Sequence, residues 1–130
     1  MIADTSFLMD LMRGDQGALR LLDACHEEGW SVHVPSIVLH ELQRGVARAR
    51  RPEREWQRIR HATTGLSVVP HDKEAAIFGG QLDGALTAAG TPIDVEDAII
   101  AAIALRENMP VVTRNVEHFR RVQGLDVVTY

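Results

Sequence analysis

Short apolar runs alternate with stretches of helical spacing along this chain, and that alternation restricts its fold more than any other feature. Five segments are predicted as strands: Met1–Ala3, SVHVP (31–35), LSVVP (66–70), the fully apolar PVVT (110–113) and LDVVTY (125–130). FLMDLM after Ser6 is predicted as a short amphipathic turn, and helices are predicted over 16–26, 36–49 with Ser36 as the cap, from Pro52 onward, 72–89 and 91–108. Strands separated by helices are joined by right-handed crossovers, so we expect a mainly parallel sheet with helices on both faces.

Length and composition fit one globular domain spanning residues 1–130, with 45% hydrophobic and 25% charged residues. The one cysteine, Cys25, excludes an internal disulfide and fits a reducing compartment. No apolar stretch approaches the ~20 residues of a membrane span, and no basic-then-apolar leader precedes Asp4. We therefore expect a cytoplasmic protein without a membrane partner.

Polar residues follow two of the apolar runs. Asp4, Thr5 and Ser6 come directly after the first run, and Asn115 follows PVVT. In parallel α/β sheets, functional groups gather at the carboxyl ends of the strands. We therefore expect Asp4 and Asn115 to lie at one crevice.

Two further carboxylates lie on helix faces that a simple hydrophobic core would not make acidic. Glu41 shares a face with Val38 and Leu42, and Asp97 shares one with Ile100. An unpaired buried carboxylate is costly and tends to become protonated, so a positive group is expected nearby.

Asp94 and Asp97 also have a purely structural explanation. Asp94 is predicted as the N-cap of its helix, and Asp97 then falls at the third helical position, near the positive end of the helix dipole. The structural role is favoured for Asp94, whereas the face that carries Asp97 turns into small core residues.

Together, Asp4, Glu41 and Asp97 predict a group of carboxylates at one edge of the sheet. Mg²⁺ or Mn²⁺ would offset their mutual repulsion, since these ions take oxygen ligands and usually pair with substrate phosphate. Such an ion can turn bound water into hydroxide and stabilise charge on a phosphoryl oxygen. The composition of the site therefore predicts metal-dependent hydrolysis of a phosphodiester.

Four segments, in order, resemble the motifs of PIN-domain nucleases, above all the small stand-alone toxins of the VapC kind from prokaryotic toxin–antitoxin pairs. These segments are ADTSFLMDL, HEL within a helix, DVEDAIIAAIAL and VVTRNVEHF, and the resemblance extends to GLDVV near the end. It implies a three-layer α/β/α sandwich and an endoribonuclease that depends on Mg²⁺ or Mn²⁺. It also implies a homodimer, an RNA substrate and a cognate antitoxin.

The resemblance assigns roles to individual residues as well. The acidic positions of the family fall on Asp4, Glu41 and Asp97, with Asn115 at a fourth place that is Asp or Asn in the family. Hydroxyl positions beside the metal site fall on Thr5 or Ser6 and on Thr113. Family members often have an acidic residue just before the phenylalanine of the last motif, whereas this chain has His118 there.

Two other functions fit parts of the same pattern. A PIN-like scaffold that holds RNA or antitoxin without cutting would need no complete acidic triad. A phosphatase of small phosphate esters would suit an aspartate at a strand end, but the DxD pair of aspartyl-phosphate enzymes is absent because position 6 is Ser6. A nuclease assay with and without EDTA separates these alternatives.

Positive charge is concentrated in RGVARARRPEREWQRIR (44–60), which holds seven arginines and two glutamates in a chain of net charge −4. Arg44 and Arg48 fall on one helix face at i, i+4, and Arg51 follows one turn on, so three positive charges are expected to line one side, beginning beside Glu41. This side would hold RNA phosphates or an acidic antitoxin segment. The alternative is a solvated face on which the arginines pair with Glu53 and Glu55.

Overall fold

The computed structural model describes residues 1–130 and contains a five-stranded sheet in the order β3-β2-β1-β4-β5. Every neighbouring pair of strands is parallel. The strands are β1 (Ile2–Ala3), β2 (His33–Pro35), β3 (Ser67–Val69), β4 (Val111–Val112) and β5 (Val127–Val128). The predicted parallel α/β architecture is confirmed, and the first strand of the chain lies at the centre of the sheet.

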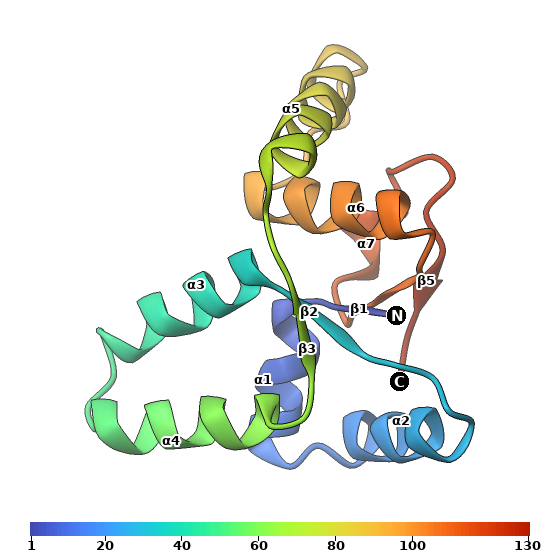
Figure 1. The fold of residues 1–130 in the computed structure, drawn as a ribbon. Helices are drawn as coiled ribbons and strands as arrows, with labels where there is room; N and C mark the ends of the chain where they lie inside the picture. Colours follow the sequence, from blue (N-terminus) through green and yellow to red (C-terminus); the bar gives the residue numbers. More distant parts are fainter.

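Seven helices surround this sheet: α1 (Thr5–Arg13), α2 (Gln16–Glu27), α3 (Ser36–Val46), α4 (Pro52–Thr63), α5 (Lys73–Ala88), α6 (Val95–Glu107) and α7 (Val116–Phe119). Helices α5 and α6 lie on one side of the sheet, and α1 and α2 on the other (Figure 1). None of these helices is long and apolar enough to cross a membrane. The layers form the expected α/β/α sandwich.

Several helix boundaries differ from the sequence prediction. FLMDLM is part of the nine-residue helix α1 rather than a short turn, because the Asp4 carboxylate accepts hydrogen bonds from the first backbone N–H groups of that helix. Helix α3 ends at Val46, earlier than predicted, and begins at Ser36 itself. Ser36 is therefore not the cap; its Oγ accepts a hydrogen bond from the backbone N–H of His71 at 2.9 Å.

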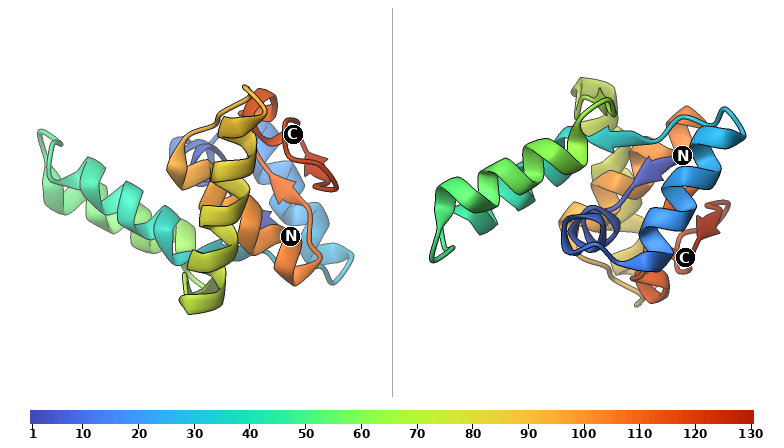
Figure 2. Two further views of the ribbon diagram at one scale, coloured as in Figure 1. Left: turned by 90° about the horizontal axis from the view of Figure 1, so that it is seen from above. Right: turned by 90° about the horizontal axis from the view of Figure 1, so that it is seen from below.

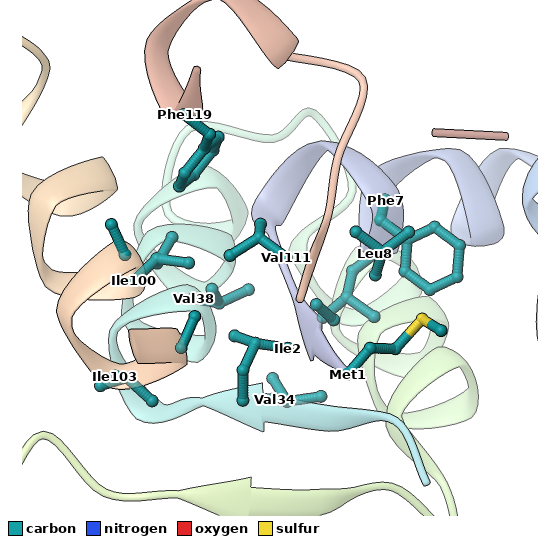
Figure 3. Packing of buried hydrophobic residues seen from close by; sticks show 14 of the residues in the cluster. Met1, Ile2, Phe7, Leu8, Val34, Val38, Ile100, Ile103, Val111 and Phe119 are labelled. Carbon is teal, nitrogen blue, oxygen red and sulfur yellow. The ribbon is translucent and has the colours of Figure 1, made fainter. Parts of the chain in front are cut away.

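The hydrophobic core joins the sheet to α6. Ile2 and Val111 of neighbouring strands lie in one cluster with Val38 of α3 and Ile100 of α6 (Figure 3). Helix α6 consists largely of alanine and isoleucine, so it is buried on more than one face. The tight packing of this helix fixes the position of its first turn, which carries Asp97.

The pair α3 and α4 projects away from the rest of the molecule (Figure 2). Its base lies at the sheet, where α3 follows β2 directly, and its far end is the turn between Val46 and Pro52. The arginine-rich segment runs through this turn and along α4. Most of the positive charge of the chain segment 44–60 therefore lies on a protruding helical hairpin.

Candidate active site

Asp4 lies at the carboxyl end of the central strand, at the N-cap of α1. Its side chain is buried and accepts hydrogen bonds from the Thr5 backbone N–H at 2.6 Å, the Ser6 hydroxyl at 2.7 Å and the Thr113 hydroxyl at 2.6 Å. Both carboxylate oxygens are thus engaged. The aspartate is held in one orientation by donors from the two ends of the chain.

The hydroxyls of Ser6 and Thr113 connect the start of α1 to the segment after β4. Ser6 Oγ lies 3.2 Å from Thr113 Oγ1 and accepts from the backbone N–H of Arg114 at 3.0 Å. Thr113 Oγ1 accepts from the backbone N–H of Asn115 at 2.8 Å. Each hydroxyl therefore donates to Asp4 and accepts from backbone, which supports the predicted positions of Ser6 and Thr113 beside the carboxylate.

Glu41 reaches the same edge from α3 and is half-buried. Its Oε2 accepts the hydroxyl hydrogen of Thr5 at 2.6 Å. Burial raises the pKa of Glu41, the nearby charges of Glu96 and Asp4 raise it further, and the Thr5 hydrogen bond opposes the shift. Glu41 and Asp4 are therefore neighbours that repel each other electrostatically.

Asp97 lies in the first turn of α6 and is buried. Its Oδ2 is 2.6 Å from Nδ1 of His118 and accepts from Asn115 Nδ2 at 3.2 Å. Burial, helped by the negative charge of Asp4, raises the pKa of Asp97 to about 6, whereas its contact with His118 lowers it. Asp97 and Asp4 thus belong to one electrostatic cluster.

Asp94 has the predicted position at the start of α6 but does not make the expected capping hydrogen bond. It occupies the N-cap position of α6, but its side chain makes no hydrogen bond to the helix. The carboxylate is exposed and lies 4.0 Å from Nδ1 of His118. Asp94, Asp97 and His118 offer ligand atoms that all lie within 4.8 Å of one another.

His118 is the residue whose place in the site was not predicted. It belongs to the four-residue helix α7, which has too few residues for a helical pattern to show in the sequence. The available signal was its position in the last motif, where the family often has an acidic residue. In this chain His118 takes that position of the motif and makes a polar contact with Asp97.

The donor set fits a hard divalent cation. Asp97 and Glu41 each have one oxygen bound by protein donors, while Oδ1 of Asp97 and Oε1 of Glu41 have no hydrogen bond from the protein. No buried side-chain polar atom lacks a partner, so these two oxygens are reached by solvent. Free carboxylate oxygens beside a buried aspartate are the ligands that Mg²⁺ and Mn²⁺ prefer.

The three predicted arginines do not form one helical side. Arg44 lies at the rim of the site and pairs with Glu96 at 3.4 Å. Arg48 lies beyond the end of α3, and Arg51 occupies the N-cap position of α4, so the shared face required a longer helix than the one that forms. Glu55 pairs with Arg58 instead of with Arg48 or Arg51.

Comparison with known proteins places the chain in a family. The PIN domain family matches residues 1–125. The chain is 34% identical over 94 residues to the protein named tRNA(fMet)-specific endonuclease VapC of Salmonella typhimurium, covering 72% of this chain and 71% of that protein. It is 30% identical over 95 residues to Ribonuclease VapC2 of Rickettsia felis, covering 73% and 71%.

Two solved structures have the same fold. VapBC2 of Rickettsia felis, bound to a DNA fragment from its promoter, matches with a TM-score of 0.90 at 23% identity, covering 98% of this chain and 96% of that one. DNA-bound VapBC of Salmonella typhimurium matches with a TM-score of 0.88 at 27% identity, with the same coverage. Together with the acidic cluster at the carboxyl edge of a parallel sheet, these similarities show that the chain belongs to the PIN-domain family, among its VapC members.

Proposed function

We propose that this protein is a metal-dependent endoribonuclease that acts as the toxin of a toxin–antitoxin pair. The observation that carries the proposal is the position of Asp4, Glu41 and Asp97 at one edge of the sheet, where burial, with the charge of Asp4 adding to it, raises the pKa values of Glu41 and Asp97. A cluster of this kind gains stability from a divalent cation and from the phosphate that accompanies it. The relatives named as VapC ribonucleases support RNA as the phosphodiester that is cut.

The three carboxylates would hold Mg²⁺ or Mn²⁺ directly or through water. When bound, the cation would lower the pKa of a coordinated water and stabilise charge on the phosphoryl oxygen. Oε1 of Glu41 accepts no hydrogen bond from the protein, so Glu41 would hold the cation through a water rather than directly and would serve as the proton acceptor. Asn115 holds Asp97 in position, and no protein nucleophile is required.

The supporting residues act by orientation. Ser6 and Thr113 fix the Asp4 carboxylate, and Thr5 fixes that of Glu41. Fixed ligands lower the entropic cost of binding a metal and a phosphate. Asp94 is the least constrained carboxylate of the group and is proposed only as a supporting residue.

The proposed partners are an RNA substrate, a cognate antitoxin and a second copy of the chain in a homodimer. VapBC structures of Rickettsia felis and Salmonella typhimurium contain both members of such a pair, which supports the antitoxin. One nuclease domain over residues 1–130 and a cytoplasmic location complete the proposal. The relative from Salmonella is named for tRNA(fMet), so that tRNA is the first substrate to test.

The decisive experiment compares the purified protein and its Asp97→Asn variant on tRNA with Mg²⁺, with Mn²⁺ and with EDTA. We expect cleavage by the wild type only when a cation is present, and none by the variant. RNA that is bound but never cut would favour the non-cutting scaffold. Hydrolysis of p-nitrophenyl phosphate without RNA cleavage would favour a phosphatase.

A further inference from the structure

Two adjoining hollows lead from the candidate site to the far end of the α3–α4 hairpin. The first is lined at one end by Thr5 and Glu41, which belong to the site. Its other end is lined by Ala49, Glu55 and Arg58, and these same residues also line the second hollow. The two depressions therefore adjoin each other along the hairpin.

The second hollow is walled by arginines. Arg50 and Arg51 come from the turn between the helices, and Arg54 and Arg58 come from α4. Arg58 pairs with Glu55 at 3.5 Å, but Arg50, Arg51 and Arg54 have no carboxylate within ion-pair distance. All of these arginines are exposed, so this end of the hairpin carries three guanidinium groups without an ion-pair partner beside the one Arg58–Glu55 pair.

The chemistry of this hollow favours phosphate over an acidic peptide. Ala49 is its one apolar residue, so it offers no pocket for the hydrophobic anchors that carry most of the energy of a protein interface. Guanidinium groups that lie close together suit phosphate, because each planar guanidinium can donate two parallel hydrogen bonds to a pair of phosphate oxygens. A nucleic-acid backbone carries phosphates at regular intervals, so one strand can contact this hollow and the site at the same time.

We propose that Arg50, Arg51 and Arg54 form a phosphate-binding platform that holds single-stranded RNA at a distance from the bond that is cut. The proposal rests on the ribonuclease function above. The platform binds the backbone without reading bases, so it sets affinity and salt dependence rather than sequence choice. Its position at the end of a protruding hairpin gives access to RNA that extends beyond the site.

The test measures binding of a short single-stranded RNA of mixed sequence in EDTA, so that no cleavage occurs. Wild type is compared with the R50A/R54A variant at several salt concentrations. We expect R50A/R54A to bind at least about tenfold more weakly, and its plot of log affinity against log salt to be shallower by about 1.4, or about 0.7 for each lost phosphate contact. R50K/R54K should keep most of the salt dependence because it keeps the charge.

R20A/R120A is the matched control, because it also removes two exposed arginines without ion-pair partners, from α2 and from the segment after α7. We expect it to bind RNA like the wild type, and all variants to melt near the wild-type temperature. Equal RNA binding by R50A/R54A and R20A/R120A would overturn the platform. So would a loss of poly-glutamate binding with unchanged RNA binding, which would make an acidic peptide the occupant.

The outcome also separates the platform from the proposed function. RNA cleavage by a wild type whose binding does not depend on Arg50 and Arg54 leaves the ribonuclease standing and overturns the platform. RNA held through these arginines but never cut with Mg²⁺ or Mn²⁺ leaves the platform standing and overturns the ribonuclease. A wild type that neither binds nor cuts RNA overturns both.

Discussion

His118 Nδ1 lies 2.6 Å from Oδ2 of Asp97, and this contact joins the short helix α7 to the first turn of α6. Asn115 donates to the same oxygen. Two partners on one oxygen fix the plane of the carboxylate and leave Oδ1 without a protein donor. His118 therefore fixes the orientation of Asp97, which the proposed cation site requires.

His118→Ala should weaken binding of Mn²⁺ by about tenfold or more, because residues that orient a metal ligand contribute on that scale. The variant also loses the contact that lowers the pKa of Asp97. Asp97 should therefore ionise at a higher pH in the variant, and Mn²⁺ binding should begin at a higher pH than in the wild type. Calorimetric titration with Mn²⁺ measures both effects. His40→Ala, at an exposed position on α3, serves as the control and should bind like the wild type. Equal affinities of the two variants would remove His118 from the site.

Asp97 should make the metal-free fold less stable as the pH rises. Its pKa is raised from 3.8 to about 6 in the folded protein, so the folded state holds a proton that the unfolded chain has already released. The stabilisation is complete below about pH 4 and is lost as the pH rises through 6. The Asp97→Asn variant has no carboxyl group to titrate at this position and keeps the stabilisation. Its free energy of unfolding should therefore exceed that of the wild type by up to about 3 kcal/mol at neutral pH.

Urea unfolding in EDTA at several pH values measures this difference in the free energy of unfolding. We expect the two proteins to be similar in acid and to diverge as the pH rises. Parallel profiles across this range would show that Asp97 is not the group that titrates. Saturating Mn²⁺ should reduce the difference, since the bound cation favours the charged carboxylate.

Asp4→Asn should abolish RNA cleavage and also destabilise the fold, unlike Asp97→Asn. Asp4 is buried and accepts hydrogen bonds from Thr5, Ser6 and Thr113, and an amide replaces one acceptor oxygen with a donor. A buried donor left without a partner costs about 1–3 kcal/mol. Thermal melting and an RNA cleavage assay on both variants check the two effects. Retained cleavage would mean that the site is misassigned.

Asp94→Ala should cost little stability, although Asp94 occupies an N-cap position. Its carboxylate makes no hydrogen bond to α6, whereas Asp15 accepts from the backbone of Gly17 and Ala18 at the start of α2. Asp15→Ala should therefore cost about 1 kcal/mol and Asp94→Ala less than about half of that. Chemical denaturation of both variants makes the comparison. A larger cost for Asp94→Ala would mean that its side chain does cap the helix in solution.

The sequence was sufficient for the fold because its central strands, β1, β2 and β4, are short, mostly apolar and largely buried. The apolar runs around Ile2, Val34 and Val111 are short and buried, as expected of interior strands. The helices between them are the usual connections of a parallel sheet. The positions of Asp4 and Asn115 followed from the rule that functional groups gather at strand ends. The family assignment is confirmed, while the catalytic roles of these residues stay predictions.

What the sequence did not predict depends on contacts between distant segments. Asp10 is buried, accepts from the hydroxyl of Tyr130 at 2.8 Å and pairs with Arg114 at 3.1 Å. Burial and the neighbouring Asp10 raise the pKa of Tyr130, which keeps its hydroxyl a donor. Nothing near Asp10 in the chain indicates these partners. The N-cap prediction for Asp94 was also based on nearby sequence alone. It took no account of His118, which lies beside Asp94 in the fold.

The central place of β1 has a consequence for the protein while it is being made. Thr113, which holds the carboxylate of Asp4, is made 109 residues after it. At ordinary rates of synthesis this interval is roughly 5 to 20 seconds. Until β4 is added beside β1, the nascent chain has Asp4 without its partners from the opposite end. The strand order therefore delays assembly of the acidic edge until the segment after β4 has been made.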